Sequence, residues 1–307
     1  VLFIVSLLVF LLTNFIGDPV DMLVPENATL EQIESARARL GLDKPLPVQY
    51  GIFIRDVLHG NFGKSYIYGK PAMDLIFERM PATLELVAVA ACLVLCIAIP
   101  LGVYAGAYPK RASSKLIMSG SILGISLPSF WVGMMMIYIF AVVLRLLPAS
   151  GRGNTVMVGN VALSIFAPGG IRYVILPAIT LALTNVATML RLTRSGILEN
   201  MRQDYIKFAR AKGVPAKSIL FGHALKNALI PVVTIFGMDL GNMIAFTTIT
   251  ETIFAWPGMG KLLIDAINKS DRPIIVAYLM AAACMFVVLN FIVDILYTLI
   301  DPRIELR

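Results

Sequence analysis

The stretch RLTRSGILENMRQDYIKFARAKGVPAKSILFGHALKN, residues Arg191–Asn227, lies between two apolar runs, Val174–Leu190 and Ala228–Thr250. It holds eight lysines and arginines but only two acids, Glu199 and Asp204. Short loops with an excess of cations beside membrane spans lie in the cytoplasm. The stretch therefore predicts a membrane protein with a cytoplasmic loop that is large enough for a soluble protein to bind.

The rest of the chain has the composition of a protein that crosses the membrane several times. Hydrophobic residues make up 58% of its 307 residues, and its mean hydropathy of +0.81 exceeds that of ordinary soluble domains. A helix needs about 20 apolar residues to cross a hydrocarbon core of roughly 30 Å. The predicted fold is therefore all-α, integral to the membrane, with six transmembrane helices. Their approximate bounds are Val1–Ile16, Leu84–Ala107, Leu116–Leu147, Val174–Leu190, Ala228–Thr250 and Ile274–Ile300.

The first apolar run, residues 1–16, is short for a span, and we expect native residues to precede Val1. A transmembrane helix is favoured over a cleaved signal peptide because no basic segment precedes the run. Residues 17–80 are polar enough to form a segment outside the bilayer. Residues 81–307 are then a core of five transmembrane helices that includes the loop 191–227.

The charges of the loops predict the orientation of the chain. The loop Arg191–Asn227 has eight cations, the loop Tyr108–Lys115 has three and the tail Asp301–Arg307 has two, which makes 13 cations in 52 residues. The loops Arg145–Tyr173 and Glu251–Pro273 have three each, in the same total length. This bias places both termini and the loop Arg191–Asn227 in the cytoplasm. Basic loops beside anionic membrane lipid account for the net charge of +7 without a nucleic-acid partner.

The outer segment, residues 17–80, carries signals for two short helices. Thr29 and Gln32 have the spacing of a capping box before the stretch Leu30–Leu40, and Gly41 follows as a stop. Residues Gln49–Leu58 can form a second helix. Two interpretations stay open for this segment. It either covers the ends of the spans or offers a docking surface to a soluble partner outside the cell.

The inner loop divides at Gly213. The residues before it, Glu199–Lys212, can form a helix, and a glycine ends helices readily. Pro215 is suited to open a second helix over Ala216–Leu225, because proline is tolerated in a first helical turn. The sequence thus predicts two short helices that form a compact knob at the membrane surface.

Five stretches of the chain together resemble a known family, the inner-membrane permease subunits of binding-protein-dependent ABC importers. The resemblance is greatest to the oligopeptide, dipeptide and nickel branch and covers essentially the whole chain. The stretches are DYIKFARAKGVPAKSILFGHALKNALIPVVT (Asp204–Thr234), LGLDKPLPVQY (Leu40–Tyr50), ERMPATLEL (Glu78–Leu86), ETIFAWPGMGKLLIDAI (Glu251–Ile267) and DPRI (Asp301–Ile304).

The resemblance implies a type I importer permease fold, a bacterial inner-membrane location and a set of partners. These are a second permease subunit, two cytoplasmic ATPase subunits that bind ATP and Mg²⁺, and a solute-binding protein outside. It also implies that a helix of the inner loop couples the permease to the ATPase. The coupling residues that it indicates are Asp204, Tyr205, Ala209, Arg210, Ala211, Lys212, Gly213 and His223. In the wider family this motif begins Glu-Ala-Ala, where this chain has Lys207, Phe208 and Ala209.

The sequence has no phosphate-binding loop of its own. Gly63-Lys64-Ser65 has the ending that such a loop requires, but Leu58 stands where its first glycine should be. We therefore expect no cofactor in this chain and ATP hydrolysis in partner subunits. We expect no metal site either. The three cysteines lie in apolar runs without metal-ligand spacing, at Cys92, Cys96 and Cys284.

Asp239 lies in the middle of a predicted span, close to Asn242. Ionisable residues at this depth are costly and often functional, so both residues are candidates for the translocation pathway. A structural hydrogen bond is the alternative role for Asp239. Asp239 would also suit a proton-coupled secondary transporter. With Asp294 it would suit an intramembrane aspartyl protease, although the Gly-x-Gly-Asp motif of that enzyme is incomplete here.

Overall fold

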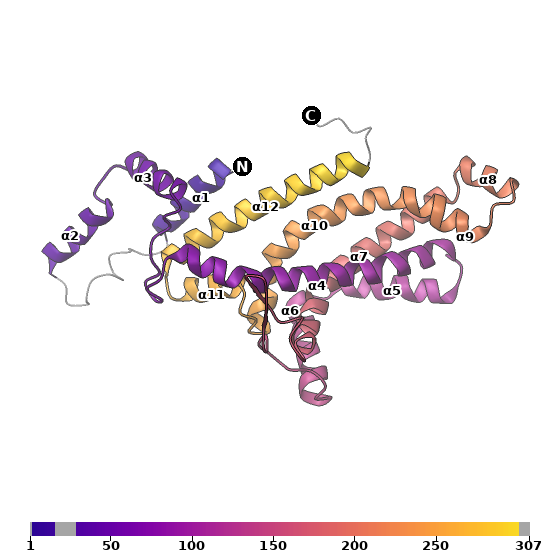
Figure 1. Cartoon of the computed structure of the whole chain (residues 1–307), viewed down its shortest axis with the longest axis horizontal. Helices are drawn as coiled ribbons and strands as arrows, with labels where there is room; N and C mark the ends of the chain where they lie inside the picture. Colours follow the sequence, from indigo (N-terminus) through magenta and orange to yellow (C-terminus); the bar gives the residue numbers. More distant parts are fainter. Residues whose placement is uncertain (1, 16–28, 301–307) are drawn as a thin grey trace. The chain divides into compact units, whose positions relative to one another are not determined.

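The computed structural model describes residues 2–15 and 29–300, which are mainly helical (Figure 1). A two-stranded antiparallel hairpin accompanies the helices. The helices are α1 Leu2–Phe15, α2 Leu30–Leu40, α3 Leu46–Leu58, α4 Ala72–Ala107, α5 Ala112–Ser126, α6 Ser129–Met136, α7 Ile171–Asn200, α8 Asp204–Ala211, α9 Ala216–Ser218, α10 Leu225–Ile253, α11 Met259–Asn268 and α12 Arg272–Ile300. Two π-helical stretches, η1 Ile137–Val143 and η2 Ile219–Ala224, continue α6 and α9, and the strands are β1 Val156–Val158 and β2 Val161–Leu163.

Among the described residues, four helical segments are long and apolar enough to cross a membrane. A fifth span results if the pair α5 and α6–η1 counts as one. The predicted membrane-spanning all-α fold is confirmed, but its spans differ from six uniform helices. The first predicted span is the 14-residue helix α1, which is shorter than the others. The four long segments are Ala72–Ala107, Ile171–Asn200, Ala216–Ile253 and Arg272–Val293.

The third predicted span, Leu116–Leu147, is not one helix. Its two halves, α5 and α6–η1, meet at an angle of 106°. The break lies at Pro128, whose ring disfavours a helical conformation of the residue before it. Leu127 accordingly has the extended angles φ −89° and ψ 130°. The proline therefore ends one helix and begins another.

The described residues form two compact units, of which the first comprises residues 2–15, 29–82 and 257–287. The predicted capping box at Thr29 and Gln32 is present, and Gly41 caps α2 at φ +68°. The second predicted helix begins at Leu46, earlier than expected. Its N-cap is Pro45. Within this unit, buried Asp271 accepts a hydrogen bond from Ser65 Oγ at 2.5 Å, which attaches the loop before α4 to the start of α12.

The second unit comprises residues 83–256 and 288–300, and α7 is its central helix. Helices α5, α6 and α10 all pack against α7 (Figure 1). Gly102 and Gly106 let α4 approach α7 closely. A Cβ atom added at these glycines would lie 2.6 Å from Thr193 Cβ and 2.7 Å from Ile197 Cβ, respectively. A pair of small residues four apart is a typical contact between membrane helices.

This contact predicts that Gly102→Ala destabilises the protein, because the added methyl group meets the backbone oxygen of Leu190 as well as Thr193. Overpacking of this kind costs about 1–3 kcal/mol. Gly120→Ala is the matched control, since its added Cβ has open space and alanine favours a helix. Thermal denaturation of the purified chain should show a lower midpoint for Gly102→Ala only. Equal midpoints for the two variants would contradict the close contact.

Candidate functional site

The basic stretch Arg191–Asn227 contains the end of one long helix, one short helix and the start of a second long helix. Helix α7 continues to Asn200, a turn follows, and α8 begins at Asp204. The predicted single helix Glu199–Lys212 is therefore wrong, because the turn with Gln203 in an extended conformation divides it. Gly213 ends α8 as predicted, with φ +78°, a conformation that glycine adopts without strain.

The second predicted helix of the knob is also different. It begins after Pro215 as expected but does not end at Leu225. Instead, the helical chain from Ala216 runs on through η2 and α10 to Ile253. The knob thus consists of α8 alone, held between the end of α7 and the start of this long helix.

Apolar packing fixes the inner face of α8. Ile206 is fully buried in a cluster that joins α8 to α4, α7, η2 and α10. Ala209 and Val214 pack against the same cluster from the end of α8 and the loop after it. Burial of a side chain such as isoleucine stabilises by roughly 1.5–3 kcal/mol, so this contact holds α8 firmly. The other buried members are Val103, Ile197, Ile219, Ala224 and Ala228.

Tyr205 ties α8 to the two long helices by hydrogen bonds. Its hydroxyl donates to Asn200 Oδ1 at 2.8 Å and accepts from Asn227 Nδ2 at 3.0 Å. Asn200 is the last residue of α7, and Asn227 lies in the first turn of α10. Movement of α8 would therefore be transmitted to both helices.

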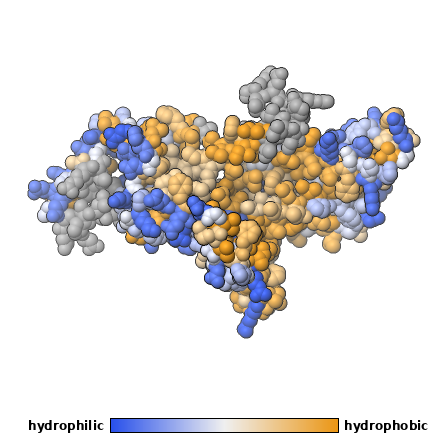
Figure 2. Space-filling view, viewed as in Figure 1, coloured by the Kyte–Doolittle hydropathy of each residue, from blue (hydrophilic) through white to orange (hydrophobic). Residues whose placement is uncertain are grey.

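The outer face of α8 is polar and exposed, apart from one aromatic ring. Figure 2 shows hydrophilic residues at the α8 end of this unit and apolar residues over its long helices. Phe208 is 61% exposed, and Lys212 Nζ lies 4.5 Å from the centre of its ring. Lys207 donates to Asp204 Oδ1 at 2.7 Å, and this hydrogen bond lowers the pKa of the Asp204 carboxyl. Arg210, Ala211 and Lys212 are exposed at the end of the helix.

His223 is the one predicted coupling residue that lies outside α8 and the residues adjoining it. It is exposed on η2, the π-helical stretch that packs against α8. The structure therefore brings the predicted coupling residues to one end of the second unit, with His223 on a neighbouring element.

The two predicted pathway residues lie on α10. Asn242 is within hydrogen-bonding reach of the Asp239 carboxyl and is exposed, whereas Asp239 is half-buried. Gly237 is on another face, where a Cβ atom would come within 2.5 Å of Val293 Cγ1 of α12. Two residues along a helix correspond to a rotation of about 200°, so Asp239 points away from that contact. The side chain of Asp294, considered above, lies outside the described residues.

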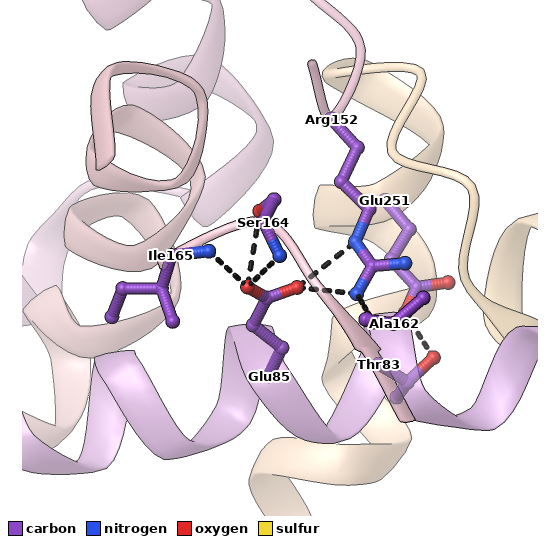
Figure 3. Close-up of polar contacts among 7 residues, drawn as sticks. All are labelled: Thr83, Glu85, Arg152, Ala162, Ser164, Ile165 and Glu251. Atoms are coloured by element: carbon purple, nitrogen blue, oxygen red, sulfur yellow. Dashed lines mark hydrogen bonds and ion pairs between the residues drawn. The ribbon is translucent and has the colours of Figure 1, made fainter. Parts of the chain in front are cut away.

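A buried polar network that was not predicted from the sequence joins α4 to the hairpin loop, residues 152–165, which contains β1 and β2 (Figure 3). Glu85 on α4 accepts hydrogen bonds from Ser164 N at 2.7 Å and Ile165 N at 2.6 Å. The Glu85 carboxylate also forms an ion pair with Arg152, whose Nη2 lies at 2.5 Å. The side chains of Glu85 and Arg152 are only 2% and 11% exposed. The signal in the sequence was Glu85 itself, an acid within an apolar helix.

A second buried contact lies beside this network (Figure 3). Thr83 Oγ1 donates to Glu251 Oε1 at 2.6 Å, which joins α4 to the end of α10. The fully buried ring of Trp256 lies 5.7 Å from the Arg152 guanidinium. Gly151 N also donates to Phe254 O at 2.8 Å. These contacts fix the loop after η1 against the end of α10.

Comparison with known sequences identifies the family. Residues 98–306 match the binding-protein-dependent transport system inner membrane component, and residues 1–87 match the N-terminal part of such membrane components. The chain is 37% identical to the probable D,D-dipeptide transport system permease protein DdpB of Escherichia coli K12, over 98% of this chain and 92% of that protein. It is 39% identical to the di/tripeptide transport system permease protein DppB of Pseudomonas aeruginosa UCBPP-PA14, over 98% and 94%.

A solved structure supports the same fold. The inward-facing MetNI methionine ABC transporter superposes with a TM-score of 0.58 at 16% identity, over 75% of this chain and 97% of that one. Identity this low bears on the fold alone. Together with the sequence matches, it shows that the chain belongs to the inner-membrane components of binding-protein-dependent transport systems, as an ABC importer permease subunit of the peptide branch.

Proposed function

We propose that this chain forms half of the translocation pathway of an ATP-driven importer for peptides or related small solutes. The other half would be a second permease subunit. Two cytoplasmic ATPase subunits would supply the energy, and a binding protein outside would deliver the solute. The names of the peptide-transport relatives support this substrate class.

The observation that carries the proposal is that one face of α8 is packed against the long helices and the other is exposed. Its inner face is locked to the ends of the long helices by Ile206 and Tyr205, while its outer face stays exposed. A short rigid helix with these attachments suits the transfer of a rigid-body motion. An ATPase subunit would bind the outer face around Phe208, with its acids near Arg210 and Lys212. The excess of cations in this region supports a cytoplasmic position, with both termini on the same side.

The pathway would follow the face of α10 that carries Asp239 and Asn242. Exposed Met238, Phe246 and Ile249 lie along the same face, since each is within about 40° of Asn242 around the helix axis. A carboxyl group on a face of this kind is costly against lipid. A second permease subunit would cover the face and enclose the polar pair. Asp239 could then meet a cationic group such as the amine of a peptide.

Transport in proteoliposomes tests the proposal. We expect dipeptide uptake when the two permease subunits, the ATPase subunits, the binding protein and ATP are all present, and none without the ATPase. The alternative of a proton-coupled transporter uses the half-buried carboxyl of Asp239. Uptake by the permease without ATPase, driven by a proton gradient, would support that alternative and overturn the importer mechanism.

A further inference from the structure

A groove with a volume of about 350 Å³ lies between the end of α4 and the start of the long helix that begins at Ala216. Its size is at the lower end of the roughly 300–1,000 Å³ of small-molecule sites. Most of its lining is apolar or aromatic. The residues that matter for its chemistry are Val103, Tyr104, Tyr108, Lys217, Leu220 and Phe221.

The groove lies at the depth where a membrane span ends. The apolar part of α4 closes with Ala107, and the polar loop Tyr108–Lys115 follows immediately. Tyrosines are typical of this interfacial level, because the ring is apolar and the hydroxyl is polar. Phe221 is 58% exposed at the other wall. The groove is therefore suited to bind hydrocarbon, such as a lipid acyl chain. This conclusion does not depend on which side of the membrane the groove faces, because both surfaces of a membrane have an interfacial layer.

The rim of the groove is positively charged. Lys217 lines it directly. The Arg111 guanidinium lies 4.1 Å from the centre of the Tyr108 ring and within hydrogen-bonding reach of the Tyr104 hydroxyl. The stretches Tyr108–Lys115 and Ala216–Asn227 contain no acid. Within the part of the chain that the structure describes, neither cation has a carboxylate partner that would neutralise it.

We propose that this groove is a binding site for an anionic phospholipid. One acyl chain occupies the apolar groove, and the phosphate headgroup is held by Arg111 and Lys217. A zwitterionic lipid would gain less from the two cations, because its headgroup carries a compensating positive charge. The charge of the rim thus selects the occupant, since basic clusters at the ends of spans favour anionic lipid.

The groove shares residues with the buried cluster around Ile206 that holds α8 in place. Val103 lines the groove and also belongs to the buried cluster around Ile206, against which Leu220 packs. A bound acyl chain would thus press on the cluster that positions α8. Lipid bound at this place is expected to rigidify the base of the short helix.

A tryptophan in the groove tests the proposal in the assembled transporter. Phe221→Trp is reconstituted in vesicles of phosphatidylcholine with a minor share of brominated phosphatidylglycerol or, separately, brominated phosphatidylcholine. The fluorescence of the transporter without the substitution is subtracted, which removes the signal of Trp131, Trp256 and any tryptophans of the other subunits. We expect quenching by the brominated anionic lipid at about tenfold lower mole fraction than by its zwitterionic counterpart. Lys217→Gln with Arg111→Gln should abolish this difference, whereas Lys226→Gln, an exposed cation that does not line the groove, should leave it unchanged.

Three results would overturn the proposal. Equal quenching by the two lipids would show that the rim does not select charge. Full selectivity in the Arg111→Gln, Lys217→Gln variant would assign the headgroup to other residues. Quenching that appears with the permease alone but vanishes in the assembled transporter would mean that a partner protein covers the groove.

Discussion

Replacing Glu85 by alanine is expected to lower the stability of the protein by about 3–5 kcal/mol, the cost of breaking a buried ion pair from one side. The substitution leaves the guanidinium of Arg152 buried without its carboxylate. It also removes the acceptor for the backbone N–H groups of Ser164 and Ile165. The hairpin loop would then lose its main polar attachment to α4.

The thermal denaturation midpoint of the purified chain measures this effect, and we expect it to fall by about 10 °C. Trp256 lies beside Arg152, so tryptophan fluorescence reports on the same region. Glu199→Ala is the matched control, because Glu199 is an exposed glutamate. In a double-mutant cycle, Glu85→Ala together with Arg152→Ala should cost clearly less than the sum of the single changes. Strict additivity would show that the two side chains do not interact.

The network around Glu85 also shows where inference from the sequence ends. An acid in an apolar helix is visible in the sequence, but its partner Arg152 is 67 residues away. Nothing local in the loop Arg145–Tyr173 distinguishes Arg152 from Arg145 or Arg172. The pairing depends on how the loop folds back over α4, and that is a property of tertiary packing.

Features governed by local chemistry were easier to predict. The capping box at Thr29, the positive φ at Gly213 and the start of a helix after Pro215 all follow from a few neighbouring residues. The bend at Pro128 has a local cause too. Its angle of 106°, however, is decided by packing, so the sequence predicted one span where two helices meet.

The knob illustrates both cases. Its basic charge and its glycine were evident in the sequence. The buried contacts that hold α8 in place were not evident, because the cluster around Ile206 combines residues from five elements. The π-helical stretch η2, which carries α9 into α10 without a break, also removed the second short helix that had been predicted.

Phe208→Asp is expected to reduce ATP-driven uptake in proteoliposomes by at least tenfold. Exposed aromatic residues at the centre of an interface often contribute 2 kcal/mol or more to binding. The ring of Phe208 makes little contact within the chain itself, so the folding of α8 should be preserved. Thermal stability should change by no more than the cation–π contact with Lys212, about 0.5–1 kcal/mol. A loss of uptake with normal stability would separate coupling from folding.

The central claim is that energy enters this permease through the outer face of α8. The most direct test is the amount of ATPase subunit that co-purifies with the tagged permease from membranes in which all subunits are expressed. Phe208→Asp is compared with Phe166→Asp, which changes a phenylalanine that is also exposed, at 65%, on the loop after β2. The account predicts that ATPase is lost with Phe208→Asp and retained with Phe166→Asp. Wild-type amounts of ATPase on the Phe208→Asp permease would contradict it.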